Sequence, residues 1–164
     1  MVVKKRTKNV PPRKAITWDE CFMRMAHIIA ERSKDPSTQA GAVIVDESNV
    51  VVGMGYNGFP RGISNNSLPW GKEGRYEDTK YAYICHAEEN AIYNAGGRST
   101  RNCKIYSVFF PCNECVKALI QSGIKEIVFE DGIKHKNRPE NIASKKMLKL
   151  SKITTRQYQS KWLT

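Results

Sequence analysis

The chain has 164 residues, of which 40% are hydrophobic and 26% are charged. This balance is typical of a single globular domain and excludes collagen-like, coiled-coil and disulfide-scaffold proteins. The net charge is +11, and the first 14 residues carry six basic side chains and no acidic one. We therefore expect a flexible basic tail over residues 1–16 and one folded domain over residues 17–164.

The apolar segments of the sequence are short. The longest, such as 42–45, hold four or five residues, far fewer than a transmembrane helix needs. No apolar stretch follows Met1, so we expect no secretory signal. The five cysteines are an odd number, which favours a reducing compartment over a disulfide framework. Together these features predict a cytoplasmic protein that does not associate with membranes.

The first half of the domain predicts a helix followed by a hairpin. Thr17 and Glu20 form a capping box, and the apolar stripe after them predicts a helix over 18–34. Two short β-branched runs, 42–45 and 50–54, are separated by polar residues. They predict an antiparallel pair of strands.

The second half of the domain alternates between strand and helix patterns. A stretch rich in glycine, asparagine and proline, 53–74, comes first and predicts a long functional loop. The elements expected after it are a helix over 86–95, a strand over 104–110, a helix over 112–122, a strand over 126–129, a helix over 139–150 and a strand over 152–158. Such alternation favours parallel strands covered by helices. The predicted fold class is α/β, a three-layer α/β/α sandwich around a mixed sheet of about five strands.

Two of the predicted helices begin with residues that ligate metals. His86 opens one helix, and Cys112 and Cys115 open the next, so two helix N-termini can point to one spot. One histidine and two cysteines supply three zinc ligands and leave the fourth tetrahedral position open, as in catalytic zinc sites. The helix N-terminus and the metal both favour the thiolate form of the cysteines. The open position would hold a water molecule made more acidic by the metal.

Glu88 lies two residues after His86, on the first turn of the same predicted helix. This position is poor for a ligand and good for moving protons near the metal. The pattern H-x-E with P-C-x-x-C is the signature of zinc-dependent nucleobase deaminases. A C-x-x-C pair also occurs in structural zinc sites and redox sites, but no second pair is present to close a four-cysteine site.

Five motifs carry a wider similarity. They are S-K-D-P-S-T-Q at 33–39, G-Y-N-G-F-P-R-G at 55–62, L-P-W at 68–70, H-A-E-E-N-A-I at 86–92 and P-C-N-E-C at 111–115. From about Trp18 to Tyr158, the chain resembles the deoxycytidylate (dCMP) deaminase family of the cytidine deaminase superfamily. The last two motifs are shared across the superfamily, whereas the first three indicate this branch.

The resemblance implies a cytidine-deaminase-like fold and hydrolysis of dCMP to dUMP and ammonia, which supplies dTMP synthesis. It also implies one catalytic Zn²⁺ per subunit, held by His86, Cys112 and Cys115, with Glu88 as the proton shuttle. A homohexamer is implied, activated by dCTP and inhibited by dTTP, with Mg²⁺ accompanying the triphosphate.

The resemblance further implies roles for two loops. Asn57 matches the asparagine that hydrogen-bonds the sugar, and Lys34 and Thr38 are candidate contacts for the substrate phosphate. Residues 53–62 would form the effector loop, in which glycines let the backbone approach a ligand. The candidate allosteric residues in this loop are Gly58, Phe59, Arg61 and Gly62. Glu89 departs from the leucine common in relatives, which suggests a paired or partly exposed position.

Three alternatives remain open at this stage. A dual dCMP/dCTP deaminase would use the same chemistry. A tRNA adenosine deaminase shares His-Ala-Glu and the cysteine pair, and the basic tail could contact phosphates. The motifs at 55–62 and 68–70 argue against it, so a nucleic-acid partner is not expected. A nucleotide sensor with a dead site would need a broken ligand set, and this one is intact. The role of His135 stays open.

Overall fold

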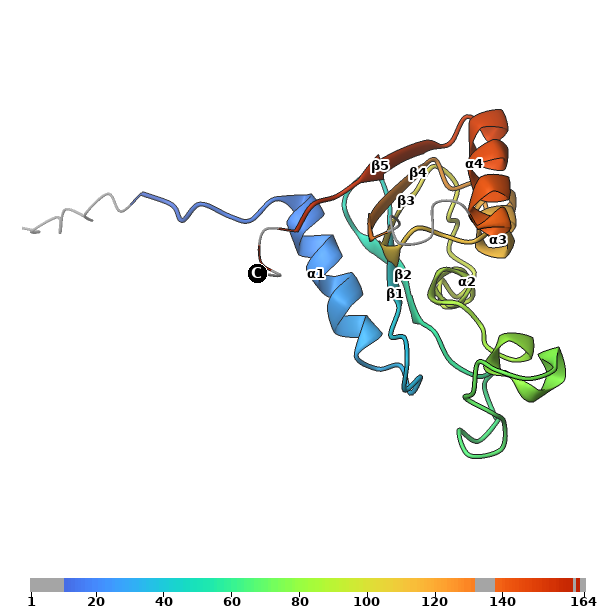
Figure 1. Ribbon diagram of the computed structural model, residues 1–164. Coiled ribbons are helices and arrows are strands. Elements are labelled where there is room, and N and C mark those ends of the chain that lie inside the picture. The colour runs from blue at the N-terminus through green and yellow to red at the C-terminus, as the bar shows by residue number, and fades with distance from the viewer. Residues whose placement is uncertain (1–10, 132–137, 161, 163–164) are drawn as a thin grey trace, which may run out of the picture.

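The computed structural model describes residues 11–131, 138–160 and 162 (Figure 1). The predicted order of helices and strands is confirmed. The elements are α1 (Trp18–Ala30), β1 (Gly41–Val45), β2 (Val51–Tyr56), α2 (Ala87–Tyr93), β3 (Lys104–Phe109), α3 (Asn113–Gln121), β4 (Glu126–Asp131), α4 (Pro139–Ser151) and β5 (Thr154–Gln157). Two short 3₁₀ turns, η1 (Tyr76–Asp78) and η2 (Lys80–Ala82), precede α2. No helix in the described part of the chain is long and apolar enough to cross a membrane.

The five strands form one mixed sheet in the order β2-β1-β3-β4-β5. Strand β1 pairs antiparallel with both β2 and β3, whereas β3, β4 and β5 run parallel. The two arrangements follow from the connections, because a tight turn joins β1 to β2 and helices join the parallel strands. The sheet therefore agrees with the mixed five-stranded sheet predicted from the sequence.

Helices cover both faces of the sheet, which gives the predicted three-layer sandwich (Figure 1). Helix α1 packs on one face, over a cluster that includes Tyr106 and Val128. Helices α2 and α3 pack on the other face, over a cluster that includes Ile105 and Ile127. Because successive residues of a strand point to opposite faces, β3 and β4 supply side chains to both clusters. Helix α4 packs beside α3.

Two predicted boundaries are wrong. The first helix ends at Ala30 rather than near Lys34, because Ser33 leaves the helical path and donates its hydroxyl hydrogen bond to the carbonyl of Asn57. The sequence predicts that the second strand ends at Met54, within a loop that begins at Gly53. Strand β2 instead runs to Tyr56, since it continues the register with β1 as far as the Gly41–Tyr56 pair. Residues 11–17, before α1, are exposed and form neither helix nor strand. The domain boundary at residue 17 stays a prediction.

Glycines in β2 let α2 lie directly on the strand. A Cβ atom added at Gly55 would stand 2.3 Å from the carbonyl oxygen of Ala87, and one at Gly53 would stand 2.2 Å from that of Ala91. Both distances are far below any normal contact. The close approach that these two glycines permit is therefore made by a helix of the same chain, and not by a ligand as expected from the sequence.

The Gly55→Ala substitution tests this packing. The added methyl group meets helix backbone, which cannot move aside like a side chain, so we expect a loss of about 1–3 kcal/mol of unfolding free energy. Gly71→Ala is the matched control, because an added Cβ there meets nothing within 4 Å. Urea unfolding followed by circular dichroism measures both. Equal stability of the two variants would contradict the close packing of α2 on β2.

Candidate active site

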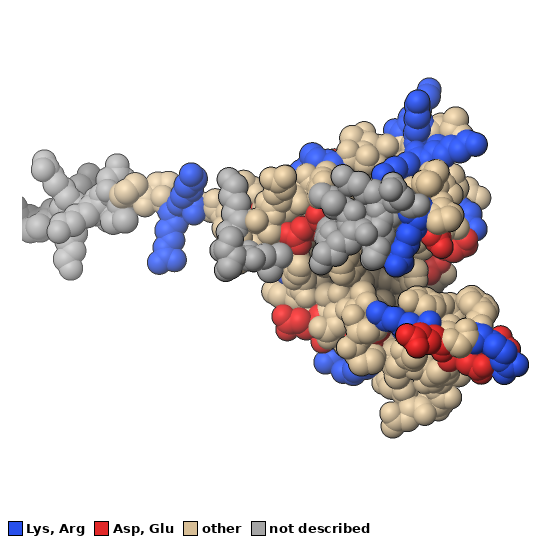
Figure 2. Space-filling view, viewed as in Figure 1, with Lys and Arg blue, Asp and Glu red and all other residues tan. Residues whose placement is uncertain are grey.

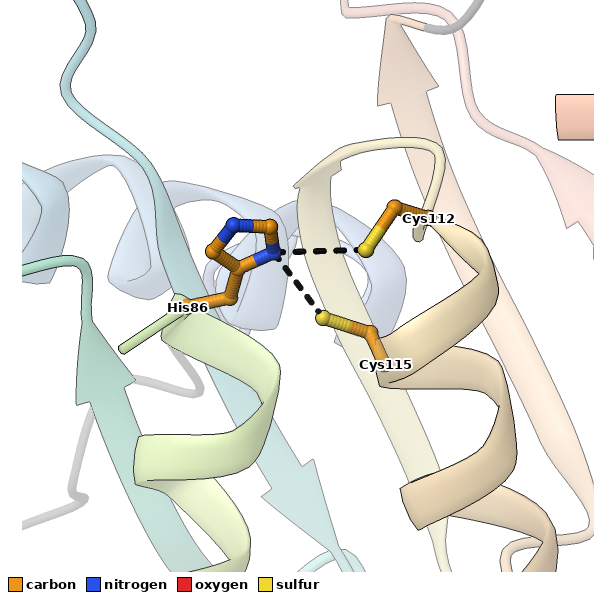
Figure 3. Close-up of side chains that lie close together, drawn as sticks. All are labelled: His86, Cys112 and Cys115. Atoms are coloured by element: carbon orange, nitrogen blue, oxygen red, sulfur yellow. Dashed lines mark hydrogen bonds between the residues drawn. The ribbon is translucent and has the colours of Figure 1, made fainter. Parts of the chain in front are cut away.

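The three predicted metal ligands converge at the N-termini of two helices. His86 is the N-cap of α2, Cys112 is the N-cap of α3, and Cys115 lies in the first turn of α3. Nδ1 of His86 is 3.4 Å from Sγ of Cys112 and 3.2 Å from Sγ of Cys115. Figure 3 shows the imidazole ring and the two thiols pointing toward one another across the gap between the helices. The sequence prediction of a shared ligand set is thus met by the geometry.

These donor atoms fit a zinc ion. In a tetrahedral site, bonds of about 2.0–2.1 Å to nitrogen and about 2.3 Å to sulfur separate the two kinds of ligand atom by about 3.6 Å. The ligand atoms of the three residues all lie within 4.8 Å of one another. No other group of three possible metal-ligating side chains in the described part of the chain has its ligand atoms this close together. Three ligands leave one tetrahedral position for water or substrate.

Hydrogen bonds among the three candidate ligand side chains shift their pKa values. Hydrogen bonds from the Cys115 thiol and from His86 outweigh burial and lower the pKa of Cys112 to about 4. The hydrogen bond to Cys112 in turn raises the pKa of His86 to about 9. The hydrogen bond to Cys112, together with burial, raises the pKa of Cys115. Because cysteine and histidine bind a metal in their deprotonated forms, metal binding at such a site is coupled to proton release.

Glu88 is buried beside the ligands, with 6% of its surface exposed. Its Oε1 accepts a 3.0 Å hydrogen bond from the Ser107 hydroxyl, and its Oε2 lies 3.6 Å from Sγ of Cys115. Burial raises the pKa of the carboxyl group, although His86 opposes the shift. A carboxyl group with a raised pKa can exchange protons near neutral pH.

Ser107 and Glu89 also contact residues of the candidate metal site. Sequence reasoning did not identify Ser107. The only sequence signal for Ser107 is that a small polar residue interrupts the apolar pattern of β3. Glu89 is half-buried, and its carboxylate accepts a 3.4 Å hydrogen bond from the backbone N–H of His86. The expectation of a paired position for Glu89 is confirmed, since it caps the helix that carries the first ligand.

Asn57, the predicted sugar contact, stabilises a loop of this fold through side-chain hydrogen bonds. Its Oδ1 accepts a 2.8 Å hydrogen bond from the backbone of Ala40, and its Nδ2 donates a 2.9 Å hydrogen bond to the carbonyl of Thr38. Asn57 thereby fixes the loop between α1 and β1, in which Lys34 is exposed and Thr38 is half-buried. The contacts of these three residues with a substrate stay predictions.

A buried ion pair holds the same loop against the segment that precedes α2. The Lys80 ammonium contacts the Asp35 carboxylate, and the two side chains are 5% and 0% exposed. Lys80 also donates a 2.9 Å hydrogen bond to Ser37. Burial opposes ionisation of Asp35, but the hydrogen bonds from Lys80 and Ser37 outweigh it, so its pKa lies below the ordinary value. Sequence reasoning missed this pair, whose members are 45 residues apart.

The candidate allosteric residues lie in a loop that contacts the approach to α2. Gly58 and Cys85 exchange two backbone hydrogen bonds of 3.1 and 2.8 Å, one residue before His86. Phe59 stacks on Trp70 with ring centroids 4.1 Å apart. Arg61 contacts the side chain of Asn94. Gly62, the remaining candidate, has a φ of 87°, which favours glycine.

The effector role of these four residues stays a prediction. His135 lies outside the described residues.

Comparison with known proteins places the chain in a family. Residues 16–131 match the family model of the cytidine and deoxycytidylate deaminase zinc-binding region. The deoxycytidylate deaminase of Mus musculus is 45% identical over 148 residues, which cover 90% of this chain and 83% of the relative. That of Homo sapiens is 44% identical over 144 residues, which cover 87% and 80%. The chain therefore belongs to the cytidine and deoxycytidylate deaminase family, and the resemblance seen in the motifs is confirmed.

Solved structures share the fold. The dCMP deaminase of cyanophage S-TIM5, solved in complex with dCMP and dUMP, superposes with a TM-score of 0.68 at 20% identity. The match covers 85% of this chain and 95% of that chain. The predicted cytidine-deaminase-like fold is thereby confirmed.

The Lys80→Met substitution tests the buried ion pair. It leaves the Asp35 carboxylate buried without its cation, so we expect a loss of about 3–5 kcal/mol of unfolding free energy at neutral pH. The loss should shrink as the pH falls, because Asp35 without Lys80 has a raised pKa and takes up a proton in the folded variant. In the wild type the pKa of Asp35 is lowered. The wild type therefore keeps this stability above about pH 4 and loses it only at more acid pH.

The matched control is Lys72→Met, at an exposed lysine of the same connecting segment. Urea unfolding at pH 7 and at pH 5 measures all three proteins. A Lys80→Met protein as stable as the control at pH 7 would contradict the structural importance of the pair.

Proposed function

We propose that this protein catalyses the hydrolytic deamination of dCMP to dUMP and ammonia and so supplies dTMP synthesis. The observation that carries the proposal is the set of one nitrogen and two sulfur ligands, with a fourth position open, beside the buried carboxyl group of Glu88. The family match, the names of the relatives and the branch motifs at 33–39, 55–62 and 68–70 support dCMP as the substrate.

In the proposed mechanism, His86, Cys112 and Cys115 hold one Zn²⁺ per subunit. When bound, Zn²⁺ would supply an acidified water at the open position, so that a hydroxide equivalent would be available at neutral pH. Glu88 accepts the proton that this water loses and delivers it to N3 of the cytosine ring. The oxygen of that water bonds to C4 of the ring, and Glu88 carries the second proton of the water to the amino group. The bond between C4 and the amino nitrogen then breaks, and ammonia leaves. The raised pKa of Glu88 suits both directions of transfer.

The proposed contacts with the rest of the substrate come from the loop between α1 and β1. Lys34 supplies an exposed cation and Thr38 a hydroxyl for the 5′-phosphate. Asn57, which holds this loop, is proposed to contact the sugar. The buried pair of Asp35 and Lys80 fixes the loop in place before a nucleotide arrives.

Regulation and assembly complete the proposal. By the family resemblance, dCTP with Mg²⁺ activates the enzyme, dTTP inhibits it, and the effector binds the loop that holds Gly58, Phe59, Arg61 and Gly62. The two backbone hydrogen bonds between Gly58 and Cys85 connect this loop to the residue that directly precedes His86. We further propose a homohexamer in the cytoplasm.

A nucleic-acid substrate is not favoured. The face seen in Figure 2 carries acidic side chains between the basic ones, instead of one continuous basic surface.

The test of this function is ammonia release, with product identification, by the zinc-loaded protein. We expect turnover of dCMP to dUMP that rises with dCTP plus Mg²⁺ and falls with dTTP. Cytidine, dCTP alone and a cytosine-containing oligonucleotide serve as competing substrates. Deamination of dCTP would establish the dual-specificity alternative, and activity restricted to the oligonucleotide would overturn the substrate assignment.

Glu88→Gln tests the proton shuttle. The amide keeps the shape of the side chain but cannot take up a proton, so we expect kcat to fall by about 10²–10⁴-fold with zinc content unchanged. Glu114→Gln is the control, because Glu114 is an exposed carboxylate in the first turn of α3. Near-normal turnover by Glu88→Gln would rule out the role assigned to Glu88.

A further inference from the structure

Ser107 is a buried hydroxyl in an apolar setting. It lies in β3, the central strand of the sheet, and is 1% exposed. The strand register places it between Ala42 of β1 and Phe129 of β4, both of which belong to the apolar cluster beneath α2 and α3. A hydroxyl in such surroundings costs free energy unless it is hydrogen-bonded. The residue that forms this hydrogen bond is therefore important for the structure or the function.

That partner is the carboxylate of Glu88. The Ser107 hydroxyl donates a 3.0 Å hydrogen bond to Oε1, while Oε2 lies 3.6 Å from Sγ of Cys115, on the side of the metal ligands. One carboxylate oxygen is thus tied to the sheet and the other faces the site. Rotation about the last side-chain bond of a glutamate is otherwise broad. At Glu88 the Ser107 hydroxyl restrains one carboxylate oxygen, and the Cys115 thiol contacts the other.

We propose that Ser107 is a positioning residue, which orients the Glu88 carboxylate for proton transfer; this inference rests on the proposed function. Helix α2 presents Glu88, but the orientation of its carboxylate is set by the central strand of the sheet. A reacting group is held best by a rigid element that fixes its rotation. Oε1 keeps a second lone pair while it accepts from Ser107, so the tie does not remove the carboxylate from the chemistry.

A matched pair of variants isolates the hydroxyl. Ser107→Thr and Ser107→Val both add volume at the same place in the core, but only threonine keeps a donor. Ser107→Ala removes the donor with no added volume, and so repeats the test if the larger side chains disturb folding. We expect Ser107→Thr to keep kcat within a few-fold of the wild type.

The two variants without the donor should lose kcat by about 10- to 100-fold, the effect of one hydrogen bond to a charged group. KM for dCMP should stay within about 2-fold, because Ser107 acts on Glu88 and not on substrate binding. Zinc content should equal that of the wild type in every variant. Equal kcat in Ser107→Thr and Ser107→Val, with Ser107→Ala also unimpaired, would overturn the proposal.

An infrared measurement tests the hydrogen bond without any substrate. In zinc-loaded protein labelled with carboxyl-¹³C glutamate, the difference spectrum between Ser107→Thr and Ser107→Val should show a shifted carboxylate band. The same difference should vanish when both carry Glu88→Gln. A flat difference spectrum would show that Ser107 does not bond to Glu88. A clear band in a protein that does not deaminate dCMP would instead refute the proposed substrate and leave the orientation of Glu88 standing.

Discussion

The structure depends on the close contact between α2 and the strand beneath it. Gly53 and Gly55 leave no side chain between β2 and the helix backbone, so the N-terminus of α2 is pressed against the sheet. Strand β3 then ends at Phe109, and the chain continues through Pro111 to bring the N-terminus of α3 beside it. This placement of the two helix N-termini brings the ligand atoms of His86 and the two cysteines within 4.8 Å of one another.

Buried polar contacts fix the positions of the loops and side chains around the candidate active site. Ser107 ties Glu88 to the sheet, and Lys80 ties Asp35 to the segment that leads into α2. Each contact joins parts of the chain that are distant in sequence. A buried charge is tolerated only with a partner, so these contacts restrict the loops and side chains around the site to one arrangement. Catalysis by positioned groups requires such restriction.

The sequence predicts the features that depend on residues close together in the chain. The metal ligands and Glu88 follow from residues two or three positions apart at helix starts, and the alternation of strands and helices predicts the layers. Contacts between distant residues leave no such trace, as for Ser107 with Glu88 and for Asp35 with Lys80. The sequence alone places Gly55 in a ligand-binding loop, because a glycine does not reveal which group approaches it. Only the packed structure identifies the helix that does.

We propose that two helix N-termini hold a zinc ion with one coordination position open. X-ray absorption at the zinc K-edge of the purified protein measures this set directly. The account predicts two sulfur ligands at about 2.3 Å and two lighter nitrogen or oxygen ligands at about 2.0–2.1 Å, one of which substrate or water can exchange. A third sulfur, such as that of the neighbouring Cys85, would indicate a closed structural site. That result would contradict the catalytic assignment.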